Sequence, residues 1–78
     1  MTAFQEYMDL RGIPCPANTA RILLKLETMP TGDVLKVTLD DGEPMENVPP
    51  ALLEQDHVIL EKVLGSNRTW DIFIKNAS

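Results

Sequence analysis

The 78-residue sequence is poor in the residues that most metal, nucleotide and disulfide chemistry requires. It has one cysteine, which cannot form an internal disulfide, so we expect a protein of the reducing cytoplasm. One histidine and one cysteine cannot complete a protein-only zinc site within one chain. No glycine-rich phosphate-binding loop is present either. The sequence therefore predicts neither a metal nor an organic cofactor.

Basic residues and long apolar runs are also scarce. Seven basic residues face twelve acidic ones, for a net charge of −5, and direct nucleic-acid binding normally requires a basic surface. No apolar run approaches the roughly 18 residues of a membrane span. The N-terminal residues are acidic and lack the apolar core of a signal peptide. We expect a soluble protein with no nucleic-acid or membrane partner.

The remaining pattern predicts a single domain over residues 1–78 with the element order β-α-β-α-β-β. Two helices should cover one face of a four-stranded mixed sheet, which makes an α+β fold of the two-layer α/β sandwich type. Pro49 and Pro50 predict a kinked second helix, or a turn followed by a helix with Pro50 in its first turn. The expected strands are Phe4–Leu10, Val34–Leu39, Val58–Leu64 and Thr69–Lys75, and the expected helices are Pro16–Met29 and Glu43–Asp56.

The first predicted helix has an apolar stripe at a spacing of 3.6 residues. Leu24 falls nearly opposite that stripe, and Arg21 and Lys25 lie on another face. The stripe is expected to face the core and consists of Ile22, Leu23, Leu26 and Met29, with Thr19 inside it.

The only cysteine lies between two prolines, in R-G-I-P-C-P. If Pro16 takes the first helical position, Cys15 becomes the N-cap, and its sulfur faces the free N–H groups of Ala17 and Asn18. The helix dipole, and Arg11 if the loop folds back, would further favour the thiolate. This geometry does not select one reaction, and an inert buried cysteine is the alternative. His57 could act as a base, but a solvated polar residue is the simpler interpretation.

Two runs, D-L-R-G-I-P-C-P and L-K-V-T-L-D-D-G, resemble the TusA/SirA family of sulfur carriers, and the likeness extends over nearly the whole chain. The resemblance implies the same two-layer fold. It also implies that Cys15 carries sulfur as a persulfide, with Pro16 shaping the first turn and Gly12 leading into it. Such proteins take sulfur from a cysteine desulfurase or a rhodanese-like donor and pass it to an acceptor protein. Outcomes in the family include tRNA thiolation.

The chain departs from the usual C-P-x-P motif at one position, where Asn18 replaces the second proline. Asn18 restores a backbone N–H and adds an amide that could hydrogen-bond near the cap or the persulfide. We expect a monomer that docks its partners around Arg11, Cys15 and the first helix. A non-catalytic regulatory or interaction module on the same fold is the alternative. Residues of the helix that could contact a partner are Arg21, Leu24 and Lys25.

Overall fold

The computed structural model of the protein describes residues 3–14 and 16–77. It confirms the predicted order of elements. Within the described part of the chain, no helix is both long and apolar enough to cross a membrane. The strands are β1 (Glu6–Asp9), β2 (Val34–Asp40), β3 (Val58–Leu64) and β4 (Thr69–Lys75), and the helices are α1 (Ala17–Glu27) and α2 (Glu43–Glu54).

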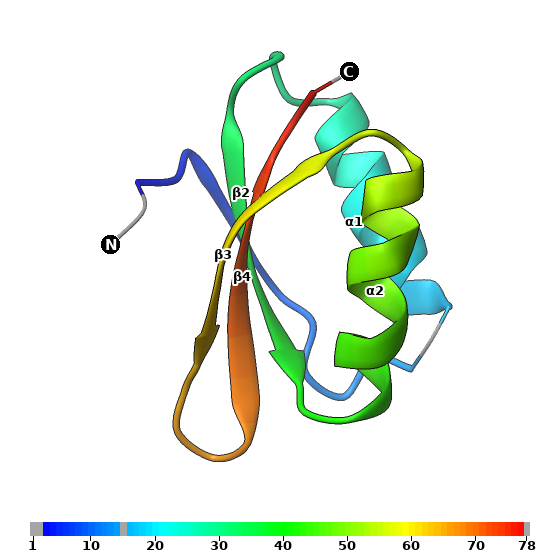
Figure 1. Ribbon diagram of the computed structural model, residues 1–78, viewed down its shortest axis with the longest axis vertical. Coiled ribbons are helices and arrows are strands. Elements are labelled where there is room, and N and C mark those ends of the chain that lie inside the picture. Colours follow the sequence, from blue (N-terminus) through cyan, green and yellow to red (C-terminus); the bar gives the residue numbers. More distant parts are fainter. Residues whose placement is uncertain (1–2, 15, 78) are drawn as a thin grey trace.

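The four strands form one mixed sheet in the order β1-β2-β4-β3. β1 runs parallel to β2, whereas the β2–β4 and β3–β4 pairs are antiparallel. Both helices cover the same face of this sheet (Figure 1). The two-layer α+β architecture expected from the sequence is therefore confirmed, as is the hairpin with its four-residue loop, residues 65–68.

Both helices begin at the end of the molecule where β1 and β2 finish (Figure 1). This arrangement follows from the parallel β1-α1-β2 connection, in which each strand leads into a helix that returns along the sheet. The loop before α1 and the turn before α2 consequently meet. The Gly12 N–H donates to Asp40 Oδ2 at 2.6 Å, which ties these two connections together.

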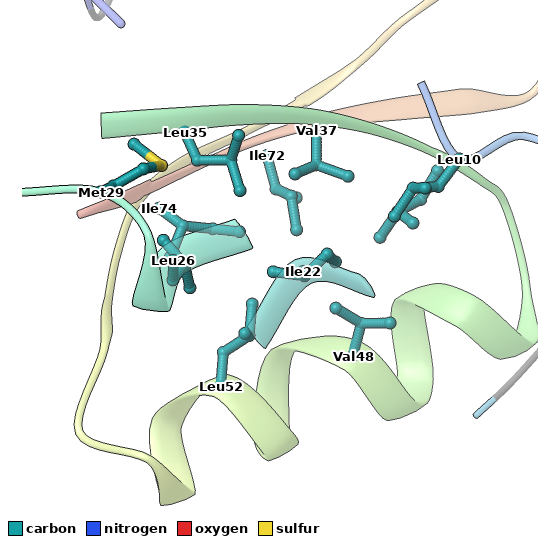
Figure 2. Close-up of a cluster of buried hydrophobic side chains, with 11 residues drawn as sticks. Leu10, Ile22, Leu26, Met29, Leu35, Val37, Val48, Leu52, Ile72 and Ile74 are labelled. Atoms are coloured by element: carbon teal, nitrogen blue, oxygen red, sulfur yellow. The ribbon is translucent and has the colours of Figure 1, made fainter. Parts of the chain in front are cut away.

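The core lies between the helices and the sheet. Ile22 and Leu26 of α1 are completely buried, and Figure 2 shows them among side chains of the sheet and of α2. Met29 is also buried, Leu23 and Thr19 are half-buried, and Leu24 is 63% exposed, as the apolar stripe predicts. The other members of the core are Leu10, Leu35, Val37, Leu39, Val48, Leu52, Ile72 and Ile74.

The N-terminal segment corrects the predicted strand Phe4–Leu10. The chain bends at Gln5, so β1 is only four residues long, and Phe4 does not share the core side with Met8 and Leu10. Its ring instead lies 6.1 Å from that of Phe73. The reason is the cation of Lys36, which lies 5.2 Å from the centroid of the Phe4 ring and attracts it electrostatically.

The structure decides between the two forms predicted for the second helix, and the turn followed by a helix that has Pro50 in its first turn is wrong. α2 is one twelve-residue helix that passes through both Pro49 and Pro50. The N–H groups that these prolines lack would have bonded to carbonyls of residues 45 and 46, in the first turn, where Glu46 is exposed. Val48 and Leu52 are completely buried on either side of the prolines. Packing against the core therefore outweighs the two missing hydrogen bonds.

Candidate functional site

The loop that connects β1 to α1 is anchored to the sheet by backbone hydrogen bonds. Leu10 is buried, and its N–H donates to the carbonyl of Thr38 at 3.0 Å. The next turn is closed by the N–H of Ile13, which donates to the Leu10 carbonyl at 3.2 Å. Gly12 has φ +78°, a conformation that residues with a Cβ adopt only with strain. The first part of the loop, residues 10–13, is therefore held in a defined conformation.

Arg11 is paired with Asp9 at the end of β1. Its Nε donates to Asp9 Oδ1 at 2.9 Å and its Nη2 to Oδ2 at 2.7 Å. These hydrogen bonds hold the pKa of the Asp9 carboxyl below its ordinary value. Asp9 therefore balances the guanidinium charge of Arg11, and the pair stabilises the start of the loop that leads to Cys15. Its predicted contribution to the cysteine stays a prediction, since Cys15 lies outside the described residues.

The start of α1 differs from the expected capping arrangement. The N-cap is Pro16, α1 begins at Ala17, and no side chain of residues 3–14 or 16–77 caps the start of the helix. The N–H of Asn18 is not free to face a sulfur atom, because it donates to the carbonyl of Pro14 at 3.2 Å. The first turn of α1 is thus hydrogen-bonded to the loop that precedes it. Pro14, Pro16 and Ala17 are all exposed, so a partner can approach this end of the helix.

The side chain of Asn18 is the most unusual feature of this end of the helix. It is completely buried, and its Oδ1 accepts the N–H of Thr19 at 2.6 Å. Within the described residues, its Nδ2 has no hydrogen-bond partner. The sequence did carry a signal for burial, since Asn18, Ile22 and Leu26 are four residues apart and share one face of the helix.

The three candidate docking residues of α1 differ in their surroundings. Lys25 Nζ pairs with Glu6 Oε1 at 3.2 Å and so links α1 to β1. Leu24 is 63% exposed, and Arg21 is exposed with no ion pair to another described residue. Arg21 and Leu24 are therefore available to a partner protein, whereas Lys25 already has an intramolecular role.

The acidic turn after β2 is more than a solvated segment. Asp40 accepts the Gly12 N–H, and Asp41 Oδ1 accepts the Trp70 Nε1–H at 2.9 Å. These contacts join residues that are 28 and 29 positions apart. These two contacts could not be predicted from the sequence, because no local pattern indicates which loops lie close together.

His57 corrects another expectation. It is 7% exposed rather than solvated, and its Nδ1 accepts the N–H of Ala77 at 3.4 Å. The ring therefore helps to hold the C-terminal segment against the junction of α2 and β3. Across residues 3–14 and 16–77, no cluster of three or more His, Cys, Asp or Glu side chains could hold a metal ion.

Comparison with known proteins agrees with this architecture. The family model described as sulfurtransferase TusA matches residues 6–76. A protein of Archaeoglobus fulgidus, provisionally named a sulfur carrier protein, is 33% identical over 70 residues, which cover 90% of this chain and 80% of the relative. The crystal structure of a SirA-like protein from Desulfitobacterium hafniense superposes with a TM-score of 0.81 at 20% identity, covering 95% of this chain and all of that one.

Proposed function

The chain belongs to the TusA family of sulfurtransferases, and from that membership we propose that it carries sulfur as a persulfide on Cys15 and relays it between two proteins. The observation that carries the proposal is the placement of the matched motif. The only cysteine of the sequence is flanked by Pro14, at the end of an anchored loop, and by Pro16, the N-cap of α1, and both prolines are exposed. A protein-bound sulfur donor must reach this end of the helix, because the two sulfur atoms must come into contact.

The reaction is a pair of thiol exchanges without net oxidation. The Cys15 thiolate attacks the outer sulfur of a donor's persulfide, R–S–SH. The S–S bond of the donor breaks, the donor leaves as the thiolate R–S⁻, and Cys15 holds S–SH. An acceptor thiolate then attacks the outer sulfur of this persulfide. The new persulfide forms on the acceptor, and Cys15 returns to its thiolate form.

The partners that suit this chemistry are proteins. A cysteine desulfurase or a rhodanese-like protein supplies the sulfur, and an acceptor protein of the thiolation or cofactor-synthesis type takes it. Both dock at the N-terminal end of α1, and Arg21 and Leu24, which are exposed farther along the helix, provide a cation and an apolar contact. The protein acts as a monomer in the cytoplasm, whose reducing conditions keep a lone cysteine available as a thiol.

The test is sulfur loading followed by intact mass measurement. The protein is incubated with a cysteine desulfurase and cysteine, and in parallel with a rhodanese and thiosulfate. The wild type should gain one sulfur atom, and Cys15→Ala should gain none. Reductant should remove the added sulfur. Absence of any gain with both donors, in a folded wild-type protein, would falsify the carrier function and favour a non-catalytic interaction module.

A further inference from the structure

Asn18 places a carboxamide where packing alone would favour an apolar side chain. It shares a face of α1 with Ile22 and Leu26, and all three are completely buried. Nearly all buried polar groups in proteins have hydrogen-bond partners. The Nδ2 of Asn18 has none within the described residues. A buried donor without a partner requires a functional or structural explanation.

The contacts of the carbonyl oxygen define which way the amide lies. Asn18 Oδ1 accepts the backbone N–H of Thr19 at 2.6 Å and its hydroxyl at 3.3 Å. Backbone N–H groups of a helix point toward its N-terminus, so this oxygen lies on the N-terminal side of Thr19. Because the oxygen is engaged as an acceptor, the other end of the amide is the donor. Asn18 is the second residue of α1, so the Nδ2 donor, which has no partner among the described residues, belongs to the first turn of the helix.

The second buried asparagine provides a contrast at the other end of the same helix. Asn76 is 1% exposed, and its Nδ2 donates to the carbonyls of Leu26 and Met29 at 2.8 and 2.7 Å. This amide ends the helix by satisfying its last carbonyls. The fold thus pairs the amide donor at the C-terminus of α1 and leaves the one at the N-terminus unpaired.

The first turn of α1 is also short of backbone donors. Pro16 has no N–H, and the N–H of Asn18 is used by Pro14. The N–H of Ala17 is the one backbone donor of this turn without a partner among the described residues. The helix terminus therefore offers an anionic sulfur less than a standard N-terminus would. The side chain of Asn18 supplies a donor that the backbone of this turn lacks.

We propose, building on the carrier function above, that Asn18 is a positioning residue whose Nδ2–H donates to the sulfur bound at Cys15. Cys15 precedes Asn18 by three residues in the sequence, and Asn18 lies in the first turn of α1. Thiolate and persulfide are both anionic acceptors, and a neutral amide stabilises them without itself gaining or losing a proton. Asn18 thereby increases the thiolate fraction and retains the persulfide until an acceptor docks.

The test compares alkylation of reduced wild type with that of Asn18→Leu across pH 5–10. Leucine has a similar size and no donor. We expect Asn18→Leu to fold and its alkylation rate at pH 7 to fall about tenfold, since less thiolate is present. Its persulfide, once loaded, should be lost faster than that of wild type. A folded Asn18→Leu with the wild-type pH profile overturns the proposal.

Asn76→Ala is the matched control, because it removes the other buried asparagine amide, which lies at the opposite end of α1. It should lower stability while leaving alkylation of the folded protein within about twofold of wild type. Alkylation needs no sulfur donor, so its outcome is independent of the loading assay. Failed loading of wild type refutes the carrier function, whereas normal loading with an unchanged Asn18→Leu profile refutes only the role of Asn18.

A measurement on the wild type covers the case in which Asn18→Leu fails to fold. In the ¹⁵N-labelled protein, the side-chain amide resonances of Asn18 should shift with pH at the same midpoint as alkylation of Cys15. They should shift again when the persulfide is loaded. Resonances that stay constant through both changes overturn the proposal, and the corresponding resonances of Asn76 provide the internal reference.

Discussion

Replacing Asn76 by alanine should destabilise the protein by about 2–4 kcal/mol. The side chain is 1% exposed, and its Nδ2 donates to the carbonyls of Leu26 and Met29 at 2.8 and 2.7 Å. Each such bond contributes about 0.5–1.5 kcal/mol, and a buried carbonyl that loses its donor costs about 1–3 kcal/mol. The lost hydrogen-bond energy and the cost of the unpaired carbonyls are partly the same free energy, so the expected total is about 2–4 kcal/mol.

This loss is large for so small a protein. At about 0.05–0.15 kcal/mol per residue, a chain of 78 residues has a free energy of unfolding of about 4–12 kcal/mol. Urea denaturation followed by far-UV circular dichroism measures the change. With a slope of about 1 kcal/mol/M, the midpoint should fall by about 2–4 M.

Two variants separate the role of the amide from other effects. Asn76→Asp keeps the size of the side chain but cannot donate, so it should be at least as destabilising as alanine. Lys75→Ala changes the exposed neighbouring residue and should stay within about 0.5 kcal/mol of wild type. An Asn76→Ala protein within about 0.5 kcal/mol of wild type, at an unchanged slope, would refute the reasoning that this amide holds the end of α1.

Three further predictions concern the loop and its docking surface. Gly12→Ala should cost about 1–2 kcal/mol in urea denaturation, because φ is +78° although nothing lies within 4 Å of the added Cβ; no loss would contradict the strain. The Asp9 carboxyl should titrate by NMR below its ordinary pKa of 3.8, since the Arg11 side chain and backbone N–H donate to it, and its pKa should rise toward the ordinary value in Arg11→Gln, which loses the guanidinium. The Asp9–Arg11 pair therefore stabilises the fold above pH 3.8, and this stabilisation is lost as the pH falls through the lowered pKa of Asp9. Leu24→Ala should leave stability within about 0.5 kcal/mol but slow sulfur loading by a protein donor; unchanged loading would remove Leu24 from the docking surface.

Much of the fold could be predicted from the sequence because local apolar patterns are strong. β3 and β4 have the predicted bounds, and the core stripe of α1 was identified by its helical spacing. The sequence could not decide between a kinked helix and a turn followed by a helix at Glu43–Asp56, because Pro49 and Pro50 break local rules and only packing of Val48 and Leu52 compensates. Helix boundaries and the bend at Gln5 depend on neighbours that lie far away in the sequence.

In the candidate site, too, some features could be predicted from the sequence and others only the structure decided. The family motif pointed to Cys15, Gly12 and Pro16. The pairing of Arg11 with Asp9 and of Lys25 with Glu6 was not visible in any local pattern. These pairings show that both cations also have a role within the fold, and the contribution of Arg11 to Cys15 stays a prediction.

The sequence by itself determined the order of elements, the apolar faces and the position of the only cysteine, because these properties follow from the periodicity and identity of neighbouring residues. Tertiary structure alone decided which polar groups meet. The bonds of Gly12 to Asp40 and of Asn76 to the end of α1 join residues 28 and about 50 positions apart. The burial of Asn18, whose Nδ2 has no partner among the described residues, is likewise a tertiary property, because a side chain is buried or satisfied only by the segments that fold around it.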